Sequence, residues 1–334
     1  MSSFDDSIAV QTITAGKLRR YHHLNLWQHL MWPSLMFKNF GDAFLVGVGF
    51  IQSLFKLIIW RPDVVFTKGG YVCLPVGMAA HVLKIPLVIH DSDAHPGLTN
   101  RILSRWATSI GTGAPLEYYH YPRSKTKYTG IPINTGFKPF TKTQQWDAKR
   151  EWGINPDAPL VVITGGGLGA VRLNNTSASI LKKLQKLASV ILLSGVGQYE
   201  ELKAKLPKNG DSFQLHAFTS KMPQLLGAAD IVITRAGATT ILELAALAKP
   251  TILVPNAALT GGHQLKNAAV YEDAKAAVVL NEDETVDNPQ LLLQALKELL
   301  ENPKATQAMA RRFSSFAKPD AAKDMAKMIL AARK

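Results

Sequence analysis

The chain is short of cysteine and of acidic residues, and both shortages limit what it can be. Cys73 is the only cysteine among 334 residues, so no disulfide can form within the chain, as suits a cytoplasmic protein. Aspartate and glutamate number 25 against 38 lysines and arginines, which gives a formal net charge of +13. An excess of this size favours an anionic partner, although a basic surface can also serve solubility alone.

Three further patterns are missing, and each absence argues against a class of function. No nucleic-acid recognition motif occurs, and the aromatic residues are not interleaved with basic ones in a groove-like pattern, so we expect no nucleic-acid partner. In the second half, no Asp-x-Asp pair follows a predicted strand, and the histidines lack metal-ligand spacing, so we expect no metal and no cofactor. The first six residues lack the basic-then-apolar pattern of a signal peptide. A phosphorylated substrate or an anionic membrane surface fits the charge better.

Residues 17–61 combine aromatic and basic side chains, with Asp42 as the only acid. The most apolar run, Phe44 to Trp60, is 17 residues long and contains Lys56. A membrane-spanning helix needs about 20 predominantly apolar residues, so we do not expect this run to span a membrane. Its composition suits a helix lying in the interface of an anionic leaflet. We expect part of the block to face the membrane and part to pack as ordinary core.

Strands alternate with helices from residue 63 onwards, which predicts parallel sheets. The expected strands are 63–67, 86–90, 109–112, 127–130, 160–164, 189–194, 214–217, 231–234, 251–254 and 276–280. The expected helices are 75–83, 98–106, 171–187, 222–229, one ending near 248, 264–272, 288–300, 304–316 and 321–333. A polar stretch with several prolines, 132–159, marks the domain boundary. We therefore predict an α/β fold of two domains, 1–135 and 156–318, with sheets facing across a cleft. The last segment, 319–334, is expected to pack back on the first domain.

Three polar loops in the second half follow β-branched apolar runs, where an open parallel sheet binds ligands. They are Gly165 to Ala170, Arg235 to Thr240, and Gly261 to Gln264 with Asn267. Backbone amides of a glycine-rich loop at a helix start can approach a phosphate. Taken alone, the first loop could equally be a tight turn without a ligand.

Polar side chains beside these loops suit the rest of a nucleotide sugar. Glu243 lies one turn into a helix, where its carboxylate can accept both ribose hydroxyls, although the helix dipole alone also favours an acid there. His263, Gln264 and Asn267 offer donors that can read sugar hydroxyls. Positive helix ends can carry a diphosphate without a metal.

The first half offers a smaller set of candidates. Gly69, Gly70 and Tyr71 follow one strand, and the run from His90 to Asp93 follows another. His90, Asp93 and His95 are the candidate acid or base groups. His90 could equally orient another group or belong to the core.

Together these segments resemble the MurG family of bacterial peptidoglycan synthesis, over nearly the whole chain. The carrying segments are 68–72, 90–93, 96–100, 130–132, 165–170 with Asn174, 235–243, and 263–264 with Asn267. The resemblance implies a GT-B fold of two Rossmann-like domains. It also implies an inverting, peripheral enzyme on the cytoplasmic side of the cell membrane. Such enzymes transfer N-acetylglucosamine (GlcNAc) from UDP-GlcNAc to the polyprenyl-diphosphate-linked acceptor lipid I, giving lipid II.

The same resemblance implies roles for individual residues. Glu243 would bind the ribose, Gln264 the sugar, and the backbone at Thr219 the uracil. Gly69, Gly70 and Tyr71 would line the acceptor diphosphate site, and the block 17–61 would dock on the membrane. The donor set also includes Gly166, Gly167, Gly169, Ala238, Thr239, Thr240, Ile241, Leu242, His263, Asp93 and Asn134.

The chain departs from the family pattern at several of these positions. The family's N-terminal glycine-rich loop, which carries its expected catalytic histidine, is not found, so either the start lies too late or the member is degenerate. The catalytic group is therefore unassigned, with His90 and Asp93 as the remaining candidates. Asp93 stands where the family has asparagine, and Asn134 where it has arginine. Two alternatives follow: transfer to another lipid acceptor, or a silent subunit that binds a nucleotide sugar.

Overall fold

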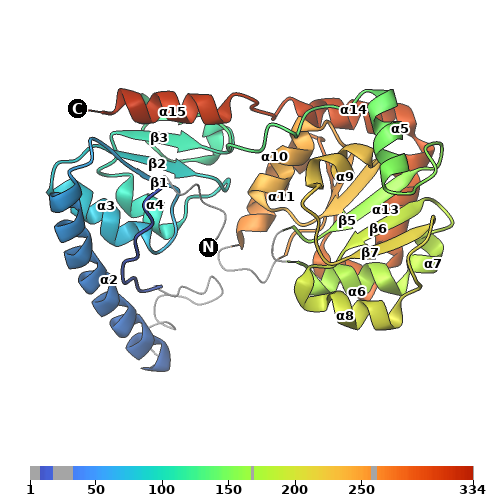
Figure 1. Cartoon of the computed structure of the whole chain (residues 1–334), viewed down its shortest axis with the longest axis horizontal. Helices are drawn as coiled ribbons and strands as arrows, with labels where there is room; N and C mark the ends of the chain where they lie inside the picture. Colours follow the sequence, from blue (N-terminus) through green and yellow to red (C-terminus); the bar gives the residue numbers. More distant parts are fainter. Residues whose placement is uncertain (1–7, 18–32, 167–168, 257–261, 334) are drawn as a thin grey trace. The chain divides into compact units, whose positions relative to one another are not determined.

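The computed structural model describes residues 8–17, 33–166, 169–256 and 262–333, which divide into two compact units (Figure 1). Unit 1 consists of Met1–Asp91, Pro96–Tyr128 and Asp324–Lys334, and unit 2 of Ser92–His95 and Thr129–Lys323. The stretch 132–159, which the sequence offered as a boundary, thus lies in unit 2. A four-residue segment that follows the second strand, Ser92–His95, also belongs to unit 2.

The sheet of unit 1 is parallel and its strands follow chain order, β1-β2-β3-β4. All five residues of β2 are buried, as expected of an inner strand covered on both faces. Val88 of β2 packs with Met325 and Ala332, so the C-terminal helix covers this sheet. The strands are β1 (Val65–Thr67), β2 (Leu87–Asp91), β3 (Ser109–Thr112) and β4 (Thr126–Tyr128). The helices are α2 (Pro33–Trp60), α3 (Cys73–Val82), α4 (Leu98–Leu103) and α15 (Ala321–Ala331), with short 3-10 turns at Leu116–Tyr118 and Arg123–Lys125.

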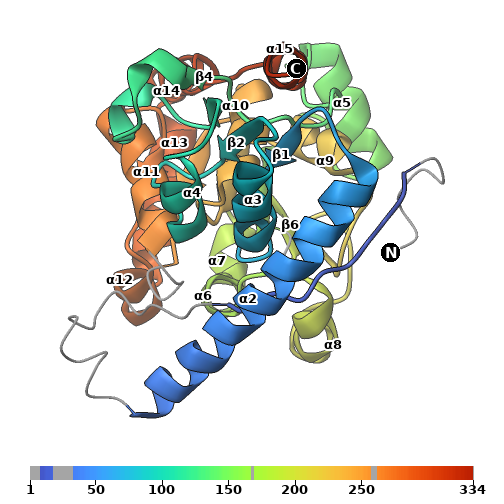
Figure 2. The same ribbon diagram turned by 90° about the vertical axis from the view of Figure 1, so that its left-hand side faces the viewer.

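Helix α2 is a long helix of 28 residues that lies beside α3 (Figure 2). Ser53 and Leu57 are buried on one side, and Thr14 of the extended segment 8–17 donates its backbone N–H to Gln52 Oε1 at 2.7 Å. The stretch of 22 residues from Asn39 to Trp60 contains an 18-residue window with a mean hydropathy of 1.9. By length and composition this stretch is long enough to cross a membrane. The run of 17 residues that the sequence suggested is therefore shorter than the apolar part of the helix.

The sheet of unit 2 is also parallel, but its strand order reverses, β10-β9-β8-β5-β6-β7. From β5 the chain moves outward through β6 to β7, and then returns to pair β8 with the other side of β5. The strands are β5 (Leu160–Thr164), β6 (Ser189–Leu193), β7 (Phe213–His216), β8 (Ile231–Thr234), β9 (Thr251–Leu253) and β10 (Val278–Val279). The reversal between β5 and β8 is the switch point at which such sheets bind ligands.

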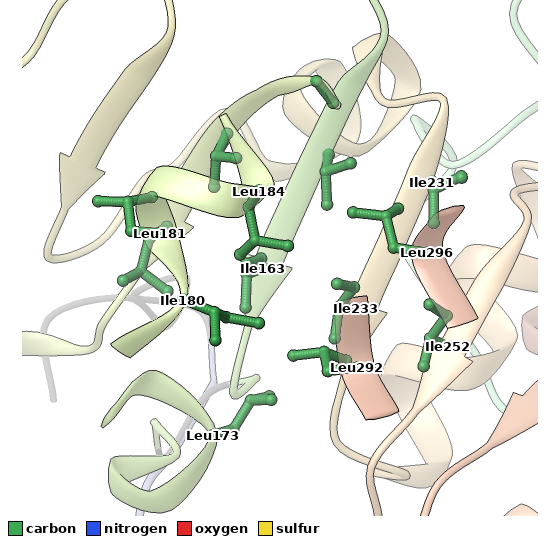
Figure 3. Packing of buried hydrophobic residues seen from close by; sticks show 14 of the residues in the cluster. Ile163, Leu173, Ile180, Leu181, Leu184, Ile231, Ile233, Ile252, Leu292 and Leu296 are labelled. Atoms are coloured by element: carbon green, nitrogen blue, oxygen red, sulfur yellow. The ribbon is translucent and has the colours of Figure 1, made fainter. Parts of the chain in front are cut away.

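Apolar side chains fix this sheet between helices. Ile163 and Ile233 are fully buried and pack with Leu173, Leu184 and Leu292 from the helices on one face (Figure 3). Leu160 and Val162 alternate with them and are equally buried, because the strands are covered on both faces. The helices are α5 (Lys142–Glu151), α6 (Val171–Ser179), α7 (Leu181–Leu184), α8 (Val196–Lys205), α9 (Met222–Ala228), α10 (Ala238–Ala246), α11 (His263–Asp273), α12 (Glu282–Asp287), α13 (Gln290–Glu301) and α14 (Pro303–Ser314).

The predicted helix 171–187 is wrong as a single element, because it breaks at Ile180 into α6 and α7. The last turns of α6 are rich in serine, and Ser177 and Ser179 bond their hydroxyls back to the backbone of Leu173 and Thr176. Such bonds compete with regular helix geometry. Helices α5, α8 and α12 were not predicted from the sequence at all.

Candidate functional site

Two loops leave the sheet of unit 2 side by side at the switch point. Thr164 and Thr234, the last residues of β5 and β8, are paired in register. Gly166 has φ +71°, and a Cβ there would lie 3.4 Å from Thr240 Oγ1 in the first turn of α10. The glycine loop after β5 therefore lies against the N-terminus of α10, where backbone N–H groups favour an anion.

The loop after β5 is tight enough to require glycine. A Cβ on Gly165 would meet the carbonyl carbon of Gly169 at 2.3 Å, so a side chain cannot be accommodated there. Gly169 and Gly195 have φ of +71° and +79°, and a Cβ on Gly195 would lie 3.2 Å from Gly169 Cα. Gly195, which follows β6, thus supports the loop, and the sequence reading missed it. Its only signal was a small residue directly after a buried strand. Gly167, predicted to bind the donor, lies outside the described residues.

Glu243 lies in α10, one turn beyond the loop after β8. Its carboxylate is half-buried, and burial alone raises its pKa from 4.5 to about 7. Among the described residues it has neither a hydrogen bond nor an ion pair to a side chain that would offset this burial. A partly desolvated carboxylate without donors gains most from hydroxyl groups that a ligand brings.

A buried ion-pair network lies next to these loops. Arg235, the first residue after β8, is 5% exposed, pairs with the buried Glu282, and donates to the carbonyl of Val254 at 3.0 Å. Arg172 of α6 also reaches Glu282, at 3.2 Å, and pairs with Asp283 at 2.6 Å. The network joins β8, β9, α6 and α12, so it fixes the elements from which the loops emerge.

The N-terminal turn of α11 contributes a second polar group. Gly262 precedes the helix with φ +58°, and Gln264 Oε1 accepts the backbone N–H of Asn256 at 2.8 Å, leaving the Gln264 amide nitrogen as its donor. Asn267 is 3% exposed, and its side-chain amide forms hydrogen bonds with Asp93, Ala94 and Ala236. The sequence interpretation of Asn267 as a reader of sugar hydroxyls is therefore wrong, since its side chain holds protein loops together.

The other predicted donor residues do not all lie at the switch-point loops. Ala238, Thr239 and Thr240 open α10, whereas the side chains of Ile241 and Leu242 are buried at 0% and 2% exposure, in the core. Thr219 uses its hydroxyl in a turn, accepting the N–H of Lys221 at 3.0 Å. Asn134 accepts the N–H of Gly136 at 2.8 Å. It lines a pocket with Ser220 and Pro223, and that pocket contains none of the loop residues after β5, β8 and β9.

The predicted acceptor loop of unit 1 is a glycine turn with buried polar atoms beside it. Gly69 and Gly70 have φ of +82° and +87°, and a Cβ on Gly69 would lie 2.9 Å from Asn100 Nδ2. Asn100 Oδ1 and Thr67 Oγ1 are buried and have no hydrogen-bond partner within the described part of the chain. Tyr71 is 46% exposed. Buried polar atoms without partners are costly, which marks the loop as a place for a polar ligand.

The candidate His90 is fully buried on β2. Its carbonyl accepts from Asn100 Nδ2 at 3.1 Å. Next to it, Tyr121 donates its hydroxyl to Asp91 Oδ2 at 2.7 Å, and burial together with this carboxylate raises the pKa of Tyr121. The position of His90 therefore suits a core residue of the sheet, and its side chain has no exposed surface with which to contact a substrate.

Comparisons with known proteins agree with this geometry. Residues 160–325 match the glycosyltransferase family 28 C-terminal domain, and residues 5–112 match the corresponding N-terminal domain. The structure of Acinetobacter baumannii MurG superposes with a TM-score of 0.70 and 27% identity, over 87% of this chain and 79% of that one. The UDP-GlcNAc 2-epimerase of Neisseria meningitidis, at 15% identity and a TM-score of 0.62, shares the fold alone. Fold and site thus define a glycosyltransferase with the GT-B fold.

Curated relatives identify the family within this class. A protein of Clostridium kluyveri is 36% identical over 296 residues, covering 88% of this chain and 78% of its own length. One of Lachnoclostridium phytofermentans is 36% identical over 294 residues, with 88% and 77% covered. Both are named UDP-N-acetylglucosamine--N-acetylmuramyl-(pentapeptide) pyrophosphoryl-undecaprenol N-acetylglucosamine transferase. The chain belongs to this family, the MurG family.

Proposed function

We propose that the protein transfers GlcNAc from UDP-GlcNAc to lipid I, with inversion at the anomeric carbon, to give lipid II. The relatives are named for this reaction. The observation that carries the proposal is the carboxylate of Glu243, which is half-buried and has no side-chain partner among the described residues, close to the glycine loop at the switch point. A hydroxyl of the acceptor attacks the anomeric carbon and loses its proton to a base, and UDP leaves with the electrons of the broken bond to the sugar.

The donor binds to unit 2 in this proposal. The diphosphate lies against the backbone N–H groups of Ala238, Thr239 and Thr240, with Gly166 and Gly169 close enough for backbone contact. Glu243 accepts the two ribose hydroxyls, and the nucleobase lies at Thr219. Gln264 donates its remaining amide to the sugar. The positive end of α10 stabilises the charge that develops on the leaving diphosphate.

The lipid-linked acceptor binds to unit 1. We place its diphosphate at Gly69, Gly70 and Tyr71, because this turn offers exposed backbone and two buried polar atoms that a ligand can satisfy. Both glycines have a left-handed φ, which is a conformation found in backbone turns that bind anions.

Helix α2 is the membrane-docking surface in this proposal, and it makes the protein peripheral on the cytoplasmic side of the cell membrane. Apolar side chains along its outer face are exposed: Phe40, Phe44, Ile51, Phe55, Ile59 and Trp60. Only 17% of its most apolar window is buried, so the helix is not an ordinary core helix. Because Ser53 and Leu57 pack inward, the helix presents one face, which suits a position along the interface.

The test is transfer of radiolabelled GlcNAc from UDP-GlcNAc to a soluble lipid I analogue by the 334-residue chain. We expect a disaccharide product, and a fall of more than about tenfold in kcat/KM for Glu243→Gln. Transfer only to diacylglycerol or to another polyprenyl-linked sugar would show that the acceptor is that lipid and not lipid I. Donor binding without transfer to any acceptor would favour a silent binding subunit.

A further inference from the structure

A chain of side-chain amides joins α6 to α8 in unit 2. Asn174 of α6 donates from Nδ2 to the carbonyl of Ser194 at 2.9 Å and to Gln198 Oε1 at 2.7 Å. Gln198 of α8 donates in turn from Nε2 to Asn175 Oδ1, also at 2.7 Å. Asn174 and Gln198 are 0% and 5% exposed, so water has little access to the bond between them. We call these four residues, from Ser194 to Asn175, the amide chain.

The direction of the amide chain is set at one end. The Ser194 carbonyl can only accept, so the Asn174 group that faces it must be the NH2 group. The same NH2 group faces Gln198, which must therefore present its oxygen to Asn174 and its own NH2 group to Asn175. Asn174 Oδ1 has no hydrogen-bond partner within the described part of the chain. The Asn174 side chain is thus held there through Nδ2, and Gln198 supplies one of its two bonds.

The carbonyl of Ser194 is also where the amide chain meets the glycine loop after β5. A Cβ on Gly169 would lie 3.2 Å from this oxygen, and the N–H of Gly169 donates to the carbonyl of Gly166 at 3.1 Å. Gly195, next to Ser194, approaches Gly169 from the same corner. Glycine has no side chain to fix its backbone, so the loop depends on what it packs against. A shift of the corner at Ser194 and Gly195 would therefore move the loop.

Helix α8, which carries Gln198, begins at this corner. Val196 is its first residue, and the backbone N–H of Gln198 donates to the carbonyl of Gly195 at 3.3 Å. The residue before the helix is glycine, so no side chain caps its first turn. The side chain of Gln198 therefore ties the first turn of α8, and with it the corner, to α6.

Fixed backbone N–H groups bind a phosphate better than mobile ones, because a mobile loop loses conformational entropy when it binds. We propose that Gln198 is a positioning residue for the donor diphosphate. It acts through Asn174 and the Ser194 carbonyl, which hold the glycine loop at Gly166 and Gly169 in its binding conformation. This inference rests on the proposed function, in which the loop contacts the diphosphate.

Binding of UDP and of uridine separates this role from a general structural one, because only UDP carries the diphosphate. Gln198→Met keeps the length of the side chain and removes both of its hydrogen bonds. We expect roughly tenfold weaker UDP binding in calorimetry, with uridine binding unchanged in an NMR titration. Asn175→Ala removes only the exposed outer partner of Gln198, and should weaken UDP binding about threefold without affecting uridine.

Gln145→Met is the matched control, because Gln145 is a partly buried glutamine at the opposite edge of the same sheet. Its Nε2 donates to the carbonyl of Ala229 at 3.0 Å and to Asp230 Oδ1 at 2.9 Å, just before β8 begins. The variant should lose a comparable amount of stability in urea unfolding, since it also loses side-chain hydrogen bonds. It should nevertheless bind UDP and uridine as the wild type does.

Several results would overturn the inference. Unchanged UDP binding in Gln198→Met, or in Asn175→Ala if Gln198→Met does not fold, would remove Gln198 from a positioning role. Equal losses for UDP and uridine would show a general loosening of unit 2, and so would a selective loss of UDP binding in Gln145→Met. A wild-type protein that binds neither UDP nor UDP-GlcNAc would contradict the proposed function itself, which distinguishes the two failures.

Discussion

Both units are built on parallel sheets, yet the two sheets prepare different kinds of site. The sheet of unit 2 reverses its strand order between β5 and β8, which opens a place where two loops meet. The described strands of unit 1 follow chain order without a reversal, so its candidate loop depends on the turn at Gly69 and Gly70 instead. The strand order of unit 2 therefore locates its candidate site, whereas the strand order of unit 1 does not.

The two units also differ in how they use polar and apolar groups. Unit 2 buries charge beneath its loops, with Arg235 and Glu282 at 5% and 3% exposure. Unit 1 does the opposite and leaves the apolar outer face of α2 exposed, with Phe44 at 69% and Phe55 at 64%. A rigid polar site suits recognition of a defined nucleotide, whereas an exposed apolar face suits a lipid surface.

The largest effect is expected from breaking the ion-pair network of unit 2. Arg235→Ala leaves the buried Glu282 with only the partly exposed Arg172, so we expect a loss of about 3 kcal/mol in the free energy of unfolding. Urea unfolding of the variant and the wild type measures this loss. Lys205→Ala, which removes an exposed pair with Glu201, should cost no more than about 0.5 kcal/mol. Similar small losses for both variants would show that the buried network does not fix unit 2.

The next effect concerns the ribose contact. Glu243→Ala should weaken UDP binding by about 1.5–3 kcal/mol, the range for a charge-assisted hydrogen bond, as measured by calorimetry. Glu298→Ala, an exposed glutamate on α13, is the matched control and should leave UDP binding as it is. Unchanged affinity in Glu243→Ala would remove this residue from the ribose site.

The apolar face of unit 1 is tested by vesicle binding. Phe44→Ser should weaken sedimentation with anionic vesicles by about 1.5 kcal/mol, the lower end for burial of a phenylalanine side chain, and leave UDP binding intact. Val196→Ser changes a residue of unit 2 that is 77% exposed, and should not alter vesicle binding. An equal effect of both substitutions would show that α2 is not the docking surface.

The smallest effect is a pH dependence from Glu243. Its pKa in the folded protein, about 7, lies above the ordinary 4.5, so its favourable contribution to stability is present below about pH 4.5 and is lost as pH rises through 7. Glu243→Gln should therefore gain stability relative to wild type as pH rises across that interval.

Donor affinity should follow the opposite course, because the ionised carboxylate is the better acceptor for ribose hydroxyls. UDP-GlcNAc binding should strengthen as pH rises through about 7, by at most about 1.4 kcal/mol per pH unit. In Glu243→Gln the profile should be flat. A flat profile in the wild type would separate Glu243 from the donor.

Strands and loops at the switch point could be predicted because buried β-branched runs ending in glycine leave few alternatives. The strands 109–112 and 160–164 coincide with β3 and β5. Helix α5 was missed because its sequence is polar, although Thr141 and Gln144 form a capping box that was visible. The role of Asn267 depends on a partner, Asp93, 174 residues away in the chain, and spacing cannot show such a contact. The reversal of strand order in unit 2 could not be predicted either, because it depends on which strands pair and not on the order of elements along the chain.

The measurement that tests the central claim most directly is a structure of the protein with UDP-GlcNAc bound. The account predicts the diphosphate against the N–H groups of Ala238 to Thr240, and both ribose hydroxyls on Glu243. A nucleotide bound elsewhere, for instance in the pocket lined by Asn134 and Ser220, would contradict it.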